Sequence, residues 1–576
     1  MPADLLKIPG VEKRRRRSWP LRRRDPASSS PWSSRIRLRP RRRFATAHER
    51  RVPWTPIAIG AGYVAIAIYG VNAIWSASRV HVAIEGIGDH ERVTSQVLGQ
   101  RSISFAVKPA GAVDKATLHI DGVLVAADAR EVRGSSVLWR PGALPEGDHQ
   151  VVLSVARPGM GKSTFRRTFA VDDTPPVLEV ARLLPATGVC EPVSVRGRTE
   201  PGSTMTLNGE PLEAKGGTFT LQYERPPAAP FHLAATDAAG NRTEAEVIAP
   251  VAYPGGQGVH VTAAAWGYEP QRQGILALVD AGLVSAVELD LKDESGIVGF
   301  NSQVPLATQV GAVRPEYRLG ETVAELKRRG VRVIGRIVAF RDPLLARWAW
   351  ENDRRDWVVQ TPAGAMLSAY GGFTNFTHPD VRRYNLDIAL EAAGAGVDDI
   401  LWDYVRRPEG APATMVVPGM PTTTADAMVE FLTTTHAALR ERCVYQGASV
   451  FGIAADRPDA VGQDIPRIAR HVDYIAPMLY PSHWVPGEYR VENPNRQPFD
   501  IVKAALADFQ VKTAGTGKVL VPWLQDFSLG HPYGPAEVRA QIDAAGELGV
   551  SDWLLWNPTA RYTSGGLDPA RVRLRR

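Results

Sequence analysis

The chain has 576 residues, which is too long for one ordinary domain, so several domains are expected. Its net charge of +7 is unevenly distributed: residues 1–51 hold 17 Lys and Arg against 4 Asp and Glu, whereas the remainder is net acidic. Only two cysteines occur, Cys190 and Cys443, and we assign them to different domains. This excludes a disulfide framework and a cysteine-based zinc site.

Residues 1–51 are predicted to be a disordered, cytoplasmic, Arg-rich tail, because they are rich in Ser and Pro and poor in apolar side chains. Residues 52–78 carry no charge, and their apolar part, Ile57 to Ala77, is long enough to cross a hydrocarbon core of about 30 Å as a helix. A buried core helix and a cleaved signal peptide are the alternatives. No charge interrupts the run, the preceding basic region is longer than a usual signal-peptide n-region, and no clear small-residue cleavage site follows.

The basic clusters before this segment predict its orientation, with the N-terminus cytoplasmic and the later domains extracellular. The sequence therefore predicts a single-pass protein of the cell membrane. The tail is expected to contact anionic lipid head groups and not nucleic acid.

Two all-β modules are predicted next, at residues 98–172 and 173–250. Short runs with alternating polarity are separated by turns about every ten residues, which is typical of β-sandwiches. The second module resembles bacterial Ig-like repeats through its Thr174-Pro175-Pro176 opening, its Thr199–Ser203 turn and its Asp237–Asn241 closing turn. We interpret both modules as spacers. The alternative is carbohydrate binding, but no cluster of aromatic residues indicates a sugar platform.

Residues 255–566 are predicted to form a (β/α)8 TIM barrel. Eight strand-like runs alternate with amphipathic helical segments, and the strands are apolar in both alternating positions, as in a parallel sheet covered on both faces. The predicted strands are 259–264, 284–291, 331–339, 400–405, 448–454, 474–479, 519–524 and 553–556. The predicted helices are 271–281, 320–329, 380–393, 424–442, 499–513 and 535–548. A small insertion is expected between the third and fourth strands.

Chemistry in such barrels occurs where the strands end, so the residues at these ends are the candidates for a site. In the second strand, Val287, Leu289 and Leu291 would face the helices, whereas Glu288, Asp290 and Lys292 would line the interior. Arg336 of the third strand would also point inward. We expect a Glu288–Arg336 pair low in the barrel, because a buried charge requires a partner.

The predicted rim combines carboxylates with aromatic rings. Two carboxylates across a cleft are the requirement for glycosidic cleavage, and flat aromatic faces suit sugar rings. Each acid alone could instead cap a loop or pair with a cation, so the prediction depends on their convergence. The rim residues are Asp290, Asp293, Asp403, Asp526, Trp266, Tyr480, Trp484, Trp523 and Trp556.

Residues 258 to about 563 resemble a family of glycoside hydrolase-like barrels that was once defined only as a domain of unknown function. The resemblance is carried by residues 287–296, 336–343, 402–408, 473–483, 522–527 and 555–557. More distantly, Met478, Tyr480 and Trp556 are similar to residues of chitinase-like sites. A chitinase-like acid would be a Glu two residues after Asp403, where this chain has Val405, so that mechanism is not supported. Arg407 also stands where the family usually has Phe.

The sequence therefore predicts a glycoside hydrolase with Asp403 as a catalytic carboxylate and Asp526, or next Asp290, as its partner. Arg406, Tyr480 and His483 would orient the substrate, and Trp556 would stack on it. Further substrate contacts are expected from Lys292, Asp293, Trp484, Trp523 and Asn557.

No cofactor and no metal are expected. The alternative is a non-catalytic, glycan-binding barrel that takes part in envelope organisation. A metal-dependent deacetylase is weaker, because no second histidine accompanies His483 at ligand spacing.

Overall fold

The computed structural model describes residues 62–70, 72, 79–157 and 161–572. The chain separates into two units, residues 1–79 and 80–576. In the first unit a helix covers residues 62–70. The predicted tail and most of the predicted membrane segment lie outside the described residues. Within the described ranges, no helix combines the length and apolar character needed to span a bilayer.

The second unit begins with an all-β module built from two sheets around one core. Its buried residues include Phe105, Leu118, Trp139 and Leu153. One sheet has the strand order β1-β3-β7-β6 and the other β2-β9-β8-β4-β5. The strands are β1 (His81–Glu85), β2 (Glu91–Val93), β3 (Ile103–Lys108), β4 (Ala116–Ile120), β5 (Val123–Leu124), β6 (Arg130–Arg133), β7 (Ser136–Trp139), β8 (Gly147–Arg157) and β9 (Gly161–Val171), with a short helix α2 (Ser95–Gln100).

This module begins earlier than the predicted residue 98. Strand β1 pairs antiparallel with β3, from His81 opposite Lys108 to Glu85 opposite Ser104. Strand β1 has only five residues, and its side chains alternate between exposed and half-buried. The sequence pattern alone therefore did not separate it from the preceding segment.

A second all-β module follows, again with two sheets, in the orders β10-β11-β14 and β13-β12-β15-β16. Its own core contains Val195, Phe219, Phe231 and Leu233. The strands are β10 (Leu178–Val180), β11 (Val193–Thr199), β12 (Thr204–Leu207), β13 (Glu210–Leu212), β14 (Thr218–Tyr223), β15 (Phe231–Thr236) and β16 (Arg242–Val247).

Cys190 and Cys443 form a disulfide, although they are 253 residues apart in the sequence. The sequence excluded a disulfide framework and placed the two cysteines in different domains, and it did not predict this single bond between them. Cys443 immediately precedes barrel strand β23, so the bond joins the second β module covalently to the barrel.

The rest of the chain is a closed parallel barrel, as predicted. Its strands pair in the order of the sequence, and β17 pairs with both β18 and β27, which closes the sheet. The strands are β17 (Gln257–Val261), β18 (Ala286–Lys292), β21 (Arg332–Val338), β22 (Asp399–Asp403), β23 (Tyr445–Phe451), β24 (Tyr474–Met478), the pair β25 (Val519–Leu520) and β26 (Trp523–Gln525), and β27 (Trp553–Trp556).

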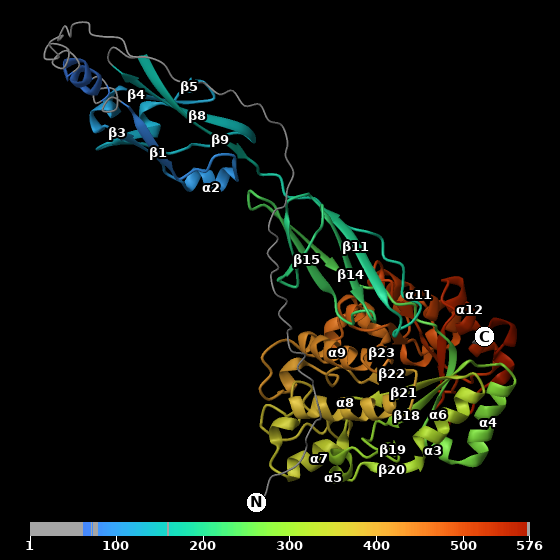
Figure 1. Cartoon of the computed structure of the whole chain (residues 1–576). Coiled ribbons are helices and arrows are strands. Elements are labelled where there is room, and N and C mark those ends of the chain that lie inside the picture. The colour runs from blue at the N-terminus through green and yellow to red at the C-terminus, as the bar shows by residue number, and fades with distance from the viewer. Residues whose placement is uncertain (1–61, 71, 73–78, 158–160, 573–576) are drawn as a thin grey trace, which may run out of the picture. The chain divides into compact units, whose positions relative to one another are not determined.

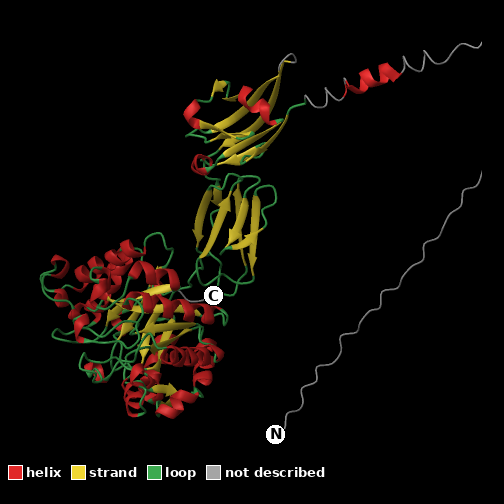
Figure 2. Cartoon of the chain, turned by 90° about the vertical axis from the view of Figure 1, so that its left-hand side faces the viewer, coloured by secondary structure: helices red, strands yellow, loops and turns green. Residues whose placement is uncertain are grey.

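Helices surround these strands, as Figures 1 and 2 show. All six predicted helices are present, with bounds that differ by at most two residues at either end. Short segments near the second strand extend the sheet, and the predicted insertion after β21 contains a further helix. The helices are α3 (Ala263–Gly267), α4 (Glu269–Asp280), α5 (Pro305–Val310), α6 (Leu319–Arg328), α7 (Pro343–Glu351), α8 (Pro379–Gly394), α9 (Thr424–Arg440), α10 (Ile465–Ile468), α11 (Pro498–Thr513) and α12 (Pro535–Glu547); the extra strands are β19 (Val298–Phe300) and β20 (Val313–Tyr317).

Alternate side chains of each barrel strand point inward and fill the interior in layers, as expected for this fold. At the end where the strands begin, Arg332 binds Asp399, and its guanidinium lies over the rings of Tyr253 and Tyr445. Above it lies an apolar cluster that includes Ile334, Leu401 and Leu554. The interior is therefore closed at the end where the strands begin. An accessible site can lie only at the end where the strands finish.

Candidate active site

A cavity of about 510 Å³ lies where the barrel strands end. Its volume is in the range of small-ligand sites. The last residues of β22, β23, β24 and β27 contribute to it, which is the position expected for a barrel enzyme. The lining residues are Glu294, Arg336, Tyr370, Asp403, Tyr404, Arg406, Glu409, Phe451, Gly452, Ile453, Met478, Tyr480, His483, Trp484, Trp523 and Trp556.

Arg336 is the central charge of this cavity. Its Nε and Nη2 donate to one oxygen of Asp403, at 3.0 and 2.6 Å, and its Nη1 donates to Asp290 at 2.6 Å. Nη2 also binds a carboxylate oxygen of Glu294. One buried guanidinium thus holds three carboxylates from β18, from the loop after it and from β22. This arrangement fixes their orientation more firmly than a flexible lysine would.

Asp403 is held by the backbone as well as by Arg336. The backbone N–H of Tyr404 donates to the other oxygen of Asp403, at 2.6 Å. Tyr404 has a φ of 52°, in the left-handed region that costs energy for a bulky residue and is found disproportionately at functional sites. The side chain of Asp403 is 4% exposed, so both of its oxygens have defined positions at the floor of the cavity.

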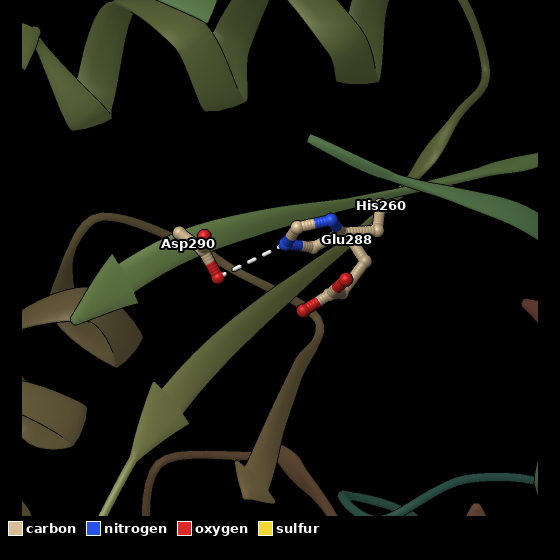
Figure 3. Close-up of side chains that lie close together, drawn as sticks. All are labelled: His260, Glu288 and Asp290. Carbon is tan, nitrogen blue, oxygen red and sulfur yellow. Dashed lines mark ion pairs between the residues drawn. The ribbon is translucent and has the colours of Figure 1, made fainter. Parts of the chain in front are cut away.

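Beneath the cavity, His260, Glu288 and Asp290 point toward one another (Figure 3). His260 Nε2 is 3.1 Å from Asp290 Oδ1, in a direction that makes the contact electrostatic and not a well-aligned hydrogen bond. Burial raises the pKa of Asp290, but His260 and Arg336 outweigh it and lower this pKa to about 2. Burial raises the pKa of Glu288 to about 8, against the opposing effect of His260 and Arg336.

The predicted Glu288–Arg336 pair is therefore wrong. The register places Arg336 beside Asp290, one layer above Glu288. Among the described residues, neither oxygen of Glu288 has a hydrogen-bond partner.

Lys292 was expected to line the interior, but it does not. The register between β18 and β21 shifts between Asp290 and Lys292, and such a shift turns the following side chain to the other face of the sheet. Lys292 Nζ donates to Asp342 at 2.8 Å and lies 5.0 Å from the ring centre of Tyr384. Asp342 in turn caps α7, so the pair anchors the insertion after β21.

Asp293 and Asp526 both accept hydrogen bonds from backbone N–H groups, and neither is among the residues that line the cavity. Asp293 accepts the N–H groups of Ser295 and Ile297, at 2.9 Å each. Asp526 accepts the N–H and hydroxyl of Thr563, at 2.7 and 2.6 Å. Burial raises the pKa of Asp526. Asn557 binds the backbone carbonyl of Asp526, so it also orders the segment after β27.

The predicted aromatic residues form one side of the cavity. The ring of Tyr480 lies 5.6 Å from that of Trp556 and 5.4 Å from that of His483. Burial and the nearby Asp403 raise the pKa of the Tyr480 hydroxyl well above its ordinary value, so it remains a hydrogen-bond donor. Burial lowers the pKa of His483, which favours the neutral imidazole. Trp484 and Trp523 complete this side, whereas Trp266 is buried against α6 and donates to Thr322.

Arg406 also reaches the cavity, although its side chain is almost fully buried. Its guanidinium lies 4.1 Å from the ring centre of Phe451 and 4.5 Å from that of Tyr404. Glu409 is its nearest carboxylate, at 4.0 Å. Such stacking stabilises a cation and leaves its N–H edge available to a ligand.

Sequence reasoning missed seven residues that line the cavity: Glu294, Tyr370, Tyr404, Glu409, Phe451, Gly452 and Ile453. Glu294 lies four residues beyond Asp290, in the loop after β18, and was expected to be part of the family motif only. The alternation of β18 identifies inward residues of the strand, but it does not extend into that loop. Only the position of Arg336 brings Glu294 to Asp403.

The fold and the site together define a barrel of the glycoside hydrolase type. The family described as "Putative glycosyl hydrolase domain" matches residues 258–562, more than half of the chain, and the protein belongs to this family. No curated protein sequence matches the chain.

Three solved structures illustrate the similarity. A hypothetical protein from Ruminiclostridium thermocellum is 25% identical, over 33% of this chain and 96% of its own, with a TM-score of 0.30. The PgaB (BpsB) glycoside hydrolase domain from Bordetella bronchiseptica is 17% identical, over 53% and 95%, with a TM-score of 0.41. The glycoside hydrolase domain of PelA from Pseudomonas aeruginosa is 11% identical, over 53% and 96%, with a TM-score of 0.32.

Proposed function

We propose that the barrel hydrolyses glycosidic bonds of a cell-surface or cell-wall polysaccharide, with Asp403 and Glu294 as its two catalytic carboxylates. The observation that carries this proposal is that both side chains line one cavity and bind the same nitrogen, Nη2 of Arg336. Family membership supports the class of reaction. The aromatic side formed by Tyr480, Trp523 and Trp556 supports a sugar as the ligand.

The surroundings of the two carboxylates suggest different roles. Asp403 is nearly inaccessible and is fixed by Arg336 and the Tyr404 N–H, which suits a group that attacks or stabilises the developing oxocarbenium centre. Glu294 is one-third exposed and lies on a loop, which suits a group that gives a proton to the leaving oxygen and then takes one from water. Arg406 and Tyr480 would position the sugar hydroxyls.

The spacing of the pair predicts the stereochemical outcome. Two hydrogen bonds to one nitrogen place the accepting oxygens within about 6 Å of each other. Retaining enzymes have carboxyl groups about 5–5.5 Å apart, and inverting enzymes about 6.5–9.5 Å apart. We therefore expect hydrolysis with retention of the anomeric configuration.

Hydrolysis of a panel of wall and capsule glycans tests this assignment, with the anomer of the first product read by NMR. We expect Asp403→Asn and Glu294→Gln each to lower kcat by about 10²–10⁴-fold, because each removes an acid, base or nucleophile. Undiminished turnover in Asp403→Asn would contradict its role. Asp526→Asn is the matched comparison: if it is as damaging as Asp403→Asn while Glu294→Gln is active, then Asp526 is the partner.

A second candidate function is glycan binding without hydrolysis. It is favoured by one observation, that Arg336 already pairs with both candidate catalytic carboxylates. In that case the protein would bind a polysaccharide at the cavity, Trp556→Ala would weaken binding, and no reducing ends would appear on prolonged incubation.

For the cellular location, we propose a single-pass membrane anchor with the barrel outside the cell. The uncharged segment at residues 52–78 after a strongly basic tail supports an anchor. The Cys190–Cys443 disulfide supports an oxidising compartment, since disulfides rarely persist in the cytosol. Protease added to intact cells is expected to degrade the barrel and to spare an epitope placed in the tail; a protected barrel would contradict this orientation.

A further inference from the structure

The buried group of His260, Glu288 and Asp290 is not used by the proposed chemistry. His260 comes from β17 and lies directly opposite Glu288 of β18 in the parallel register. Asp290 follows on the same face of β18. One ligand atom from each of the three lies within 4.8 Å of the others. Figure 3 shows the three side chains converging from two adjacent strands.

This group has polar atoms that the described residues leave without partners. Glu288 is completely buried, and among the described residues neither of its oxygens has a hydrogen-bond partner. His260 Nδ1 has none either, whereas His260 Nε2 has only its ion-pair contact with Asp290. A buried carboxylate without a partner costs several kcal/mol, so native proteins satisfy such groups with a cation, a proton or an ordered water. Arg336 does not fill this role, because its hydrogen bonds go to Asp290, Glu294 and Asp403.

We infer that His260, Glu288 and Asp290 form a binding site for one first-row divalent metal ion beneath the substrate cavity. One imidazole nitrogen and two carboxylates are a donor set that suits Zn²⁺, Mn²⁺ and Fe²⁺ better than Ca²⁺ or Mg²⁺. Metal–ligand bonds of about 2.0–2.2 Å place two ligand atoms at most about 4.4 Å apart, so small side-chain rotations would bring the three groups onto one ion.

Two tyrosine hydroxyls fix the backbone that carries two of the three ligands. Tyr562 donates to the backbone carbonyl of His260 at 2.5 Å, and Tyr317 donates to that of Asp290 at 2.9 Å. The rings of Trp523 and Trp556 lie 6.1 and 6.4 Å from the imidazole and shield it on the cavity side. The ion would be a fixed charge under the cavity floor, connected to Asp403 through Asp290 and Arg336.

The test uses the full chain, treated with a chelator and dialysed, and it measures metal and not hydrolysis. Calorimetric titration with Zn²⁺ and Mn²⁺ chlorides, together with elemental analysis, is expected to show one ion per chain and a higher Tm with metal than without. Co²⁺ is expected to give a visible d–d absorption. The readout is independent of substrate, so failure of the proposed hydrolase function would not affect it.

Glu288→Gln and His260→Gln preserve side-chain size and are expected to weaken metal binding by more than about 100-fold, because outer hydrogen-bond partners alone are worth 10–100-fold. Asp293→Asn is the matched control: it removes a partly buried carboxylate of the same segment and should leave affinity unchanged. A circular dichroism spectrum identical to the parent's establishes that each variant is folded. Absence of a bound ion in the parent, or equal binding by Glu288→Gln, would overturn the proposal.

Discussion

The two ends of the barrel each contain an arginine from the same strand, β21, and they use it differently. At the end where the strands begin, Arg332 binds one carboxylate, Asp399, with aromatic rings of Tyr253 and Tyr445 on its faces. At the other end, Arg336 binds three carboxylates below an open cavity. The first arrangement balances charge and closes the barrel. The second concentrates negative charge where a ligand can reach it, which distinguishes a stabilising end from a chemical one.

The largest expected effect on stability comes from breaking the closed end. Arg332→Met should lower the free energy of unfolding by about 3–5 kcal/mol, because it leaves the Asp399 carboxylate buried without its cation. Denaturant unfolding measures the change. The double variant Arg332→Met/Asp399→Leu should recover much of the loss, because it removes both charges together. A double variant as unstable as the single one would show that packing, and not the unpaired charge, is responsible.

The same substitution at the open end should affect activity more than stability. Arg336→Met is expected to lower kcat by about 10²-fold or more, because Asp403 and Glu294 lose the donor that fixes their orientation. The unfolding free energy should fall by less than in Arg332→Met, since Asp290 keeps its contact with His260, Asp403 keeps the Tyr404 N–H, and Glu294 is one-third exposed. Paired kinetic and denaturation measurements check both parts. If Arg336→Met is as unstable as Arg332→Met, the distinction between a stabilising end and a chemical end of the barrel is wrong.

The smallest expected effect is a pH dependence of the closed end, where His471 precedes β24. Burial, assisted by His436 and Arg470, lowers the pKa of His471 from an ordinary 6.5 to about 4. At pH values between these two pKa values, His471 binds a proton in the unfolded chain but not in the folded chain. The free energy of unfolding should therefore fall as the pH drops from about 6.5 to about 4. Because His471 is partly exposed, we expect a loss of about 1–2 kcal/mol and not the full linkage value.

Denaturant unfolding at a series of pH values measures this slope, and His471→Asn should flatten it in that window. Unchanged pH dependence in the variant would assign the acid sensitivity to another group of the same end, such as Asp473 with His436 and Arg440.

These comparisons also show why the fold was more predictable than the site. The barrel could be predicted from the sequence because its eight strands and six main helices each show a pattern of apolar residues that is typical of the element. Such a pattern depends only on residues that are close together in the chain. The exceptions have local causes. The first strand ends at Val261 because Thr262 caps α3, although the apolar Ala263–Ala265 continues the pattern of a strand. The fifth begins at Tyr445 because the buried Gln446 is satisfied by Trp402 and two backbone carbonyls.

The site depended on contacts that no local pattern contains. Asp403 could be placed on the rim because strand ends are predictable. Its neighbour Glu294 could not, because it lies on a loop and reaches Asp403 only through Arg336. The shift of register after Asp290, which removes Lys292 from the interior, is likewise a property of the paired strands and not of either sequence alone.

The Cys190–Cys443 bond has a mechanical consequence. A force applied to the N-terminal part of the chain would pass from Cys190 directly to Cys443, ahead of β23, and would bypass residues 191–442. The segment that connects the second β module to β17 would then bear no tension. The strands β17, β18, β21 and β22, which follow it in the chain, would bear none either. Reduction of the bond would transfer the whole load to β17, the first strand of the barrel, whose register with β18 sets the spacing of His260 and Glu288.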